Sequence, residues 1–107
     1  MSREKTAAFL ADCLKHMPEQ PEQLQRVVDT VIAGLTRIAS GQAWPDGEAL
    51  KAGWAATYWS AAAMAAWAAV RAAPSEAAWA ADWAARAHPD PDAERERQKA
   101  VREELGL

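Results

Sequence analysis

The sequence predicts a small, soluble, all-α protein, and three observations lead to this fold class. Apolar residues recur at helical spacing along most of the 107 residues. Prolines, serines and aspartates stand where helices are expected to begin and end. No segment alternates apolar and polar residues as a half-buried strand does, and no hairpin turn signal joins two such segments. We therefore expect one domain over residues 1–107, a helical bundle of about five helices.

Two apolar stripes define the first pair of helices. One helix is expected over residues 3–17, before Pro18, and the next begins near Pro21 and stops before Gly41. The stripes consist of Phe9, Leu10, Cys13, Leu14 and Met17 in the first helix, and of Leu24, Val27, Val28, Val31, Leu35 and Ile38 in the second. Spacings of three and four residues within each stripe predict that each helix buries one face.

An Ala- and Trp-rich stretch follows the short link around Trp44. We expect a long helix over residues 47–73, capped by Asp46 and ended by Pro74. If continuous, it would be about 40 Å long at about 1.5 Å per residue. Its large side chains point in several directions, which predicts a central helix buried on several sides. Gly53 is a place where this helix could kink, so its continuity is left open.

A fourth helix is expected to start with Ser75 as its N-cap. It carries Trp79 and Trp83 four residues apart, so their side chains share one face. The helix is expected to end near His88, where a proline follows.

The last helix is expected over residues 91–105. Asp90 supplies its N-cap, and Pro91 is suited to its first turn. The helix is heavily charged, and we expect ion pairs between Glu94 and Arg97, Glu96 and Lys99, and Lys99 and Glu103. Its narrow apolar stripe consists of Ala93, Ala100, Val101 and Leu105.

The charge pattern excludes two classes of partner. The formal net charge is −3, and Lys and Arg are scattered rather than clustered, so we expect no nucleic-acid partner. Residues 52–70 carry no charge, but this stretch is mostly Ala and nearly lacks the Leu, Ile, Phe and Val that drive membrane insertion. We interpret it as a buried helix and expect no membrane partner.

The N-terminal segment and the cysteine content indicate a cellular compartment. Charged residues interrupt the apolar runs of residues 1–16, so no signal peptide is expected. The single Cys13 rules out an internal disulfide and suits a reducing environment. A cytoplasmic location is expected.

No set of residues predicts catalysis or a cofactor. The sequence has no glycine-rich phosphate loop, no Gly-x-Ser-x-Gly elbow and no His-Glu-x-x-His pair. Cys13 and His16 have a spacing that can present two metal ligands on a helix, and His88 is the remaining strong candidate. A structural zinc site needs about four ligands, so we expect no metal. A metal or small-ligand module using these three residues is kept as an alternative.

The tryptophans are the main candidates for a binding surface. The chain has 28 Ala and six Trp, so most of the large apolar surface belongs to Trp. We expect Trp54, Trp67 and at least one of Trp79 and Trp83 to fill the core. Trp is also common among binding hot spots, and the interface candidates are Trp44, Trp59, Trp79, Trp83 and Arg86. We place Trp44, in a loop, and Trp59 first, and we expect both to be exposed.

The stretch Leu10-Ala11-Asp12-Cys13-Leu14-Lys15-His16 resembles the opening of the Imm-5-like immunity proteins of bacteria. The similarity continues through Leu35-Thr36-Arg37-Ile38-Ala39-Ser40-Gly41 and the Ala-rich residues 49–70 and 77–87, and so covers about residues 7–87. The high Trp content and the compressed second half depart from the family's pattern. The resemblance implies a helical protein that protects its own cell by binding a toxin, and it transfers no catalytic or binding residue.

The leading functional hypothesis is a small non-catalytic protein that binds and neutralises a protein partner, a toxin or effector. A related hypothesis is an inhibitor that a mobile element carries and that blocks a host defence complex. It would act by the same kind of surface binding. A second class is an assembly protein, in which the tryptophans form a homodimer or larger oligomer. A self-interface that contains these tryptophans would distinguish the second class from the first.

Overall fold

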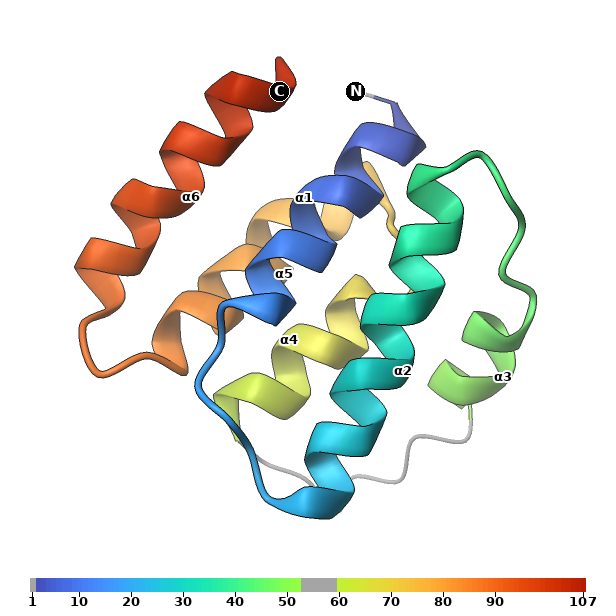
Figure 1. The fold of residues 1–107 in the computed structure, drawn as a ribbon, viewed down its shortest axis with the longest axis horizontal. Helices are drawn as coiled ribbons and strands as arrows, with labels where there is room; N and C mark the ends of the chain where they lie inside the picture. Colours follow the sequence, from blue (N-terminus) through green and yellow to red (C-terminus); the bar gives the residue numbers. More distant parts are fainter. Residues whose placement is uncertain (1, 53–59) are drawn as a thin grey trace.

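The computed structural model describes residues 2–52 and 60–107. These residues form six α-helices and no strand, which confirms the all-α fold class for the described part of the chain (Figure 1). The helices are α1 (Arg3–Lys15), α2 (Glu22–Ala39), α3 (Asp46–Ala52), α4 (Ala61–Ala69), α5 (Pro74–Arg86) and α6 (Pro91–Leu105). None of the described helices is long and apolar enough to cross a membrane.

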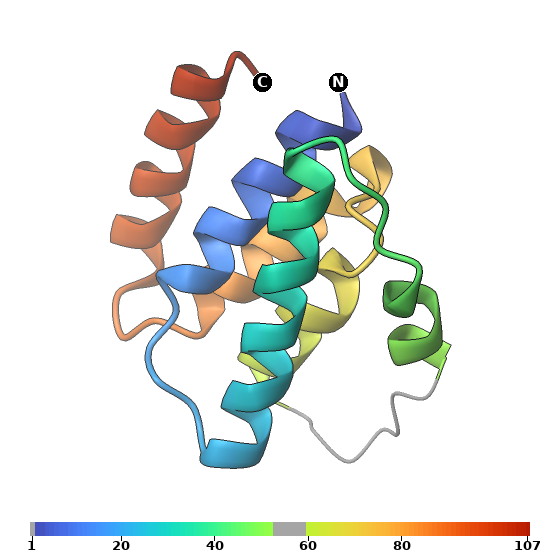
Figure 2. The same cartoon turned by 45° about the vertical axis from the view of Figure 1, so that its right-hand side comes forward.

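Four helices form the body of the molecule. α1 packs along α2, α4 packs along α5, and the two pairs contact each other (Figure 1). α6 lies at one side of this body, against α1 and α5, and α3 lies at the opposite side (Figure 2). The chain ends lie near each other at one end of the molecule (Figures 1 and 2).

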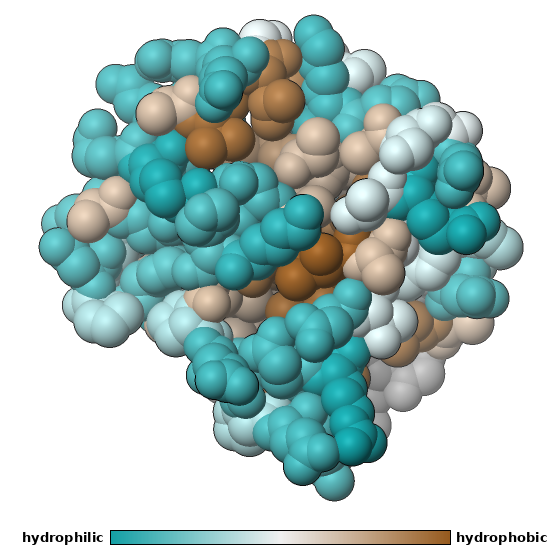
Figure 3. All heavy atoms as spheres, viewed as in Figure 1, coloured by the Kyte–Doolittle hydropathy of each residue, from teal (hydrophilic) through white to brown (hydrophobic). Residues whose placement is uncertain are grey.

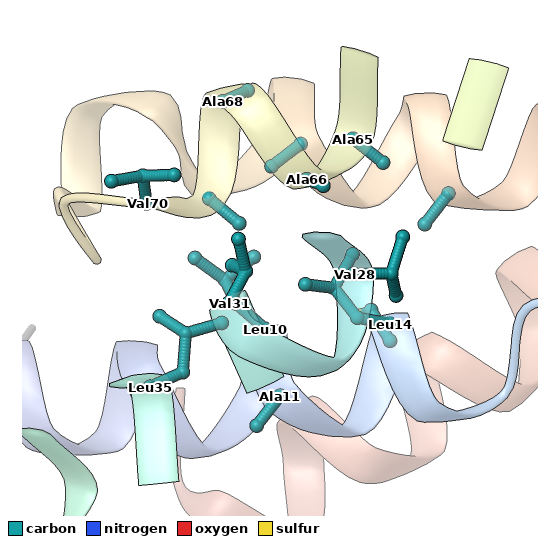
Figure 4. Packing of buried hydrophobic residues seen from close by; sticks show 14 of the residues in the cluster. Leu10, Ala11, Leu14, Val28, Val31, Leu35, Ala65, Ala66, Ala68 and Val70 are labelled. Carbon is teal, nitrogen blue, oxygen red and sulfur yellow. The ribbon is translucent and has the colours of Figure 1, made fainter. Parts of the chain in front are cut away.

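The core joins bulky side chains to alanines. Leu10 and Leu14 from α1 and Val28, Val31 and Leu35 from α2 point toward the alanines of α4 (Figure 4). All the buried residues of α4 and α5 are alanines, and their small side chains let neighbouring backbones approach closely. The predicted apolar stripes of the first two helices are confirmed, since their members are buried apart from Val27, which is half-buried.

The long helix expected over residues 47–73, whose continuity the sequence left open, is interrupted at Ser60. Ser60 has an extended backbone with φ −90° and ψ 159°, which a helix interior does not allow. Its side-chain oxygen accepts a hydrogen bond from the backbone N–H of Ala63 at 3.1 Å, so Ser60 is the N-cap of a new helix. α4 ends at Ala69, and Ala72 then has a left-handed φ of 50° in the turn to α5. Gly53 lies outside the described residues.

The start of α5 also differs from the prediction. The helix begins at Pro74 with Ala73 as its N-cap, rather than after Ser75. Pro74 is suited to the first turn because its fixed φ matches the helix and its missing N–H would have had no partner there. The predicted start of α6 is confirmed, since the carboxylate of Asp90 accepts from the N–H of Ala93 and Pro91 opens the helix.

Candidate interaction surface on α5 and α6

Three of the predicted interface residues lie together on the outer face of α5. Trp79 is 51% exposed, and it is the single exposed large apolar side chain in the described part of the chain. The rings of Trp79 and Trp83 meet edge to face, with centroids 6.5 Å apart. The guanidinium of Arg86 lies 4.7 Å from the centre of the Trp83 ring. We call Trp79, Trp83 and Arg86 the α5 patch.

The α5 patch is held in place by charges on one side and by packing on the other. Asp82 accepts from Arg86 at 2.9 Å, one turn along the helix, and this pair fixes the guanidinium over the ring of Trp83. Trp83 is partly buried against the core, and its indole N–H has no hydrogen-bond acceptor within the described residues. Packing therefore positions Trp83, while Trp79 projects into solvent.

Trp44 does not behave as predicted, because it is partly buried rather than exposed. Its ring lies directly over Gly34 of α2, where any added Cβ would collide with it, and also against Gly47 of α3. The two glycines leave the space that the indole ring fills. Trp44 is thus a packing residue that fastens α3 to α2.

Of the three remaining tryptophans, the structure describes Trp67. Trp59 and Trp54 lie outside the described residues. Trp67, which was expected in the core, is partly buried and packs against it, and the ammonium of Lys51 lies 4.2 Å from the centre of its ring. Lys51 also forms an ion pair with Glu76 at 3.3 Å. These contacts join α3 to α4 and α5.

α6 docks on the body mainly through polar groups. Its two buried residues are Glu94 and Gln98. The side-chain amide of Gln98 donates to the backbone carbonyl of Ala81 at 2.9 Å and to Glu94 at 3.2 Å. Arg97 donates to both oxygens of Glu94, at 2.6 and 2.8 Å, and to Asp12 of α1 at 2.7 Å. α6 is therefore fixed by hydrogen bonds to both α1 and α5.

The charges in this network shift two pKa values. Burial of Glu94 would raise the pKa of its carboxyl, but the hydrogen bonds and charge of Arg97 outweigh it, so the net pKa lies below its ordinary value. His88 adds to this lowering. The hydrogen bond to Glu94 raises the pKa of Arg97 against the effect of burial, with a further contribution from Asp12. Both groups are charged at neutral pH.

The apolar stripe predicted for α6 is only partly the face that packs inward. Ala93 and Ala100 are exposed, whereas Val101 and Leu105 pack against the core. Figure 3 shows that the outer surface of α6 in that view is mostly hydrophilic. Of the predicted ion pairs within this helix, the Glu94–Arg97 pair is present, and no ion pair joins Lys99 to Glu96 or Glu103 in the described structure.

A groove separates α5 from α6 beside the α5 patch. It has a volume of about 250 Å³ and is lined by Ala78, Ala81, Asp82, Arg95, Gln98, Lys99 and Arg102. We call it the basic groove. Arg95 crosses it and binds Asp82 of α5 at 3.1 Å. Sequence reasoning missed this groove, although Arg95, Lys99 and Arg102 follow the four- and three-residue spacing of one helix face.

The candidate ligands Cys13, His16 and His88 do not form a metal site. Cys13 is buried, and burial together with the charge of Asp12 raises the pKa of its thiol to about 12. His16 is exposed and bonds through Nδ1 to the backbone carbonyl of Asp12 at 2.9 Å. His88 lies by Glu94, 3.8 Å from its carboxylate. Within residues 2–52 and 60–107, no three His, Cys, Asp or Glu side chains are placed to hold a metal ion.

Comparison with protein-family models, with curated proteins and with solved structures found no match to this chain.

Proposed function

We propose that this chain is a non-catalytic helical protein that binds and neutralises a protein partner through the α5 patch. The proposal belongs to the immunity or inhibitor class. Its partner would be a toxin or an effector, or a host defence complex if a mobile element carries the gene. Neutralisation would follow from covering a working surface of the partner with preformed helices.

The exposure of Trp79 is the observation that carries the proposal. The alanines around it, Ala78 and Ala77, offer little apolar surface, so Trp79 contributes most of the apolar area of this face. The indole of Trp79 is about half exposed in the free protein. Each Å² of it that a partner covers contributes about 25 cal/mol to the binding free energy. Trp and Arg are the residue types most enriched among binding hot spots, and the α5 patch combines them.

The surroundings of the patch favour recognition over non-specific adhesion. Asp82 and Arg95 form a charged rim beside Trp79, and a polar rim around an apolar centre is the usual anatomy of a specific interface. Within the patch, Trp83 is held in place by its packing against the core. A fixed anchor loses little conformational freedom when it binds, so more of the contact energy appears as affinity.

The test is a pull-down from the native cell with wild-type bait and variants of the patch. Trp79→Ala is expected to lose about 2 kcal/mol or more of binding free energy, and Arg86→Ala about 1 kcal/mol or more. Arg26→Ala is the matched control, because Arg26 forms the same kind of ion pair one turn along α2, with Glu22 at 2.7 Å. It is expected to bind as the wild type does.

Light scattering on the purified protein separates this proposal from its rival. A monomer that captures a foreign protein through Trp79 supports the inhibitor function. A stable oligomer that dissociates on Trp79→Ala and captures only itself would replace that function with homo-oligomeric assembly, because Trp79 would then anchor a self-interface. Capture of a partner that Trp79→Ala and Arg86→Ala both leave unchanged would reject the α5 patch.

A further inference from the structure

We infer that the partner recognised by the α5 patch is an acidic protein surface, whose carboxylates enter the basic groove between α5 and α6. The inference rests on the proposed function and specifies the chemistry of its partner. It is carried by two cations of the groove, Lys99 and Arg102, which form no ion pair in the described structure and lie beside an exposed tryptophan.

The groove has an excess of positive charge although the whole chain is negative. Its lining includes Arg95, Lys99 and Arg102 but a single carboxylate, that of Asp82. The formal net charge of the chain is −3. The net charge of the groove is therefore opposite in sign to that of the whole chain, as expected for a surface that selects its partner by charge.

The single carboxylate of the groove is already neutralised. One oxygen of Asp82 accepts from Arg86 at 2.9 Å, and the other accepts from Arg95 at 3.1 Å. Asp92 also binds Arg95, at 3.0 Å. Asp82 is thus shared by two guanidinium groups and has little capacity left to compensate the other cations of the groove.

Lys99 and Arg102 keep their charge available. Neither side chain lies within ion-pair distance of a carboxylate in the described structure. Both are exposed, and the guanidinium of Arg102 lies 5.8 Å from the centre of the Phe9 ring. Two unpaired donors on successive turns of α6 can each bind one carboxylate of a partner.

The position of the groove ties these cations to the α5 patch. Ala78 and Asp82 line the groove, and Trp79 lies between them in sequence on the exposed side of α5. One partner segment can therefore cover the indole and reach Lys99 at the same time. The exposed carboxylates Glu96 and Glu103 on the outer side of α6 would repel a continuous polyanion, which favours a protein with a few placed carboxylates over nucleic acid.

A library of random peptides displayed on phage tests the inference without a known partner. Selection on the wild-type protein, with counter-selection on the double variant Lys99→Glu and Arg102→Glu, is expected to enrich peptides that combine Asp or Glu with apolar residues. These peptides should bind the wild type about tenfold more tightly than the double variant at low salt, and the difference should shrink at high salt.

The matched control is the double variant Lys15→Glu and Arg26→Glu, which changes the charge equally on exposed positions of α1 and α2. It should bind the selected peptides as the wild type does. Circular dichroism melting should show all variants folded, since the substituted residues are exposed.

Four results would overturn the inference: no enrichment, enrichment of basic or neutral peptides, equal binding to the Lys99→Glu and Arg102→Glu variant, or displacement of the peptides by a single-stranded oligonucleotide. Trp79→Ala then separates the two proposals. Peptides that need Trp79 but not Lys99 would leave the α5 patch in place and reject an acidic partner. Peptides that need Lys99 but not Trp79 would keep an acidic ligand for the basic groove and reject the α5 patch.

Discussion

α1 and α6 pack against the same helix, α5, but they are held there by opposite kinds of contact. The residues that α1 buries in the core include Ala7, Leu10 and Leu14, all of them apolar. α6 presents Glu94 and Gln98, which are almost as deeply buried and polar. One helix is thus held mainly by the hydrophobic effect, and the other largely by hydrogen bonds and charge.

The difference matters because the two kinds of contact fail differently. Apolar burial is non-directional, so a lost methyl group costs energy in proportion to the area and the cavity. A buried polar network contributes little net energy while it is complete, but each group left without a partner costs its full desolvation. We therefore expect the body of the molecule to unfold as a unit, and α6 to detach from it when a single hydrogen bond is removed.

The largest effect is expected in the body. Leu10→Ala removes a fully buried side chain that faces α4, and should lower the free energy of unfolding by about 2–5 kcal/mol. Urea unfolding followed by circular dichroism measures this loss. Val27→Ala is the matched control, because Val27 is half-buried and should cost clearly less. Equal losses at the two positions would contradict the description of the core.

α3 provides a third kind of attachment, through the ring of Trp44. Gly34→Ala should lower stability by about 1–3 kcal/mol, because the added methyl group collides with that ring. The same substitution in a Trp44→Ala background should be neutral or stabilising, since the collision is gone and Ala favours helix over Gly by about 1 kcal/mol. Denaturation of the four proteins completes the cycle, and additive effects would show that Gly34 and Trp44 do not touch.

The polar network of α6 predicts a smaller and more local effect. Arg97→Ala leaves the buried carboxylate of Glu94 without its main partner and should cost about 1–2 kcal/mol. Amide hydrogen exchange should accelerate throughout α6 while the amides of α1 and α2 stay protected. Arg102→Ala, on the same helix but without an ion pair, should leave exchange unchanged. Uniform acceleration in every helix would mean that α6 does not separate from the body.

Acid should weaken the same attachment more gently. Because the pKa of Glu94 is lower in the folded protein than its ordinary value of 4.5, this carboxylate stabilises the fold fully above that value. The stabilisation is lost as the pH falls below this ordinary value and through the lower folded pKa. Melting temperature measured across these pH values should fall less steeply for Glu94→Gln than for the wild type. Parallel curves would exclude Glu94 as a source of acid sensitivity.

Sequence reasoning predicted the helices whose signals are local. α2 has an apolar stripe and a terminal Gly41 with φ 81°, and α6 has the Asp90 cap and Pro91, so their bounds follow from neighbouring residues. The break before Ala61 escaped prediction because Ala favours helix on both sides of Ser60. A run of alanines presents the same small side chain on every side of the helix. It therefore does not indicate which face of the helix packs against the core.

The candidate site was predicted in part. The spacing of Trp79, Trp83 and Arg86 on one helix placed them near one another, and the structure brings them into contact. The expectation that Trp44 is exposed was wrong, because Gly34 and Gly47 open a space that its ring fills. A contact between a glycine and a ring on another segment leaves no periodic signal.

The sequence by itself determined the all-α class, the ends of α2 and α6, and the residues of α1 and α2 that face the core, because caps and stripes act within a few neighbouring positions. The tertiary structure alone decided which face of α6 turns inward. Glu94 and Gln98 are buried because Ala81 and Arg97 satisfy them and because Arg97 reaches Asp12, 85 residues earlier. A polar residue is expected to be exposed until all its partners are known, and here Ala81 and Asp12 lie on other helices.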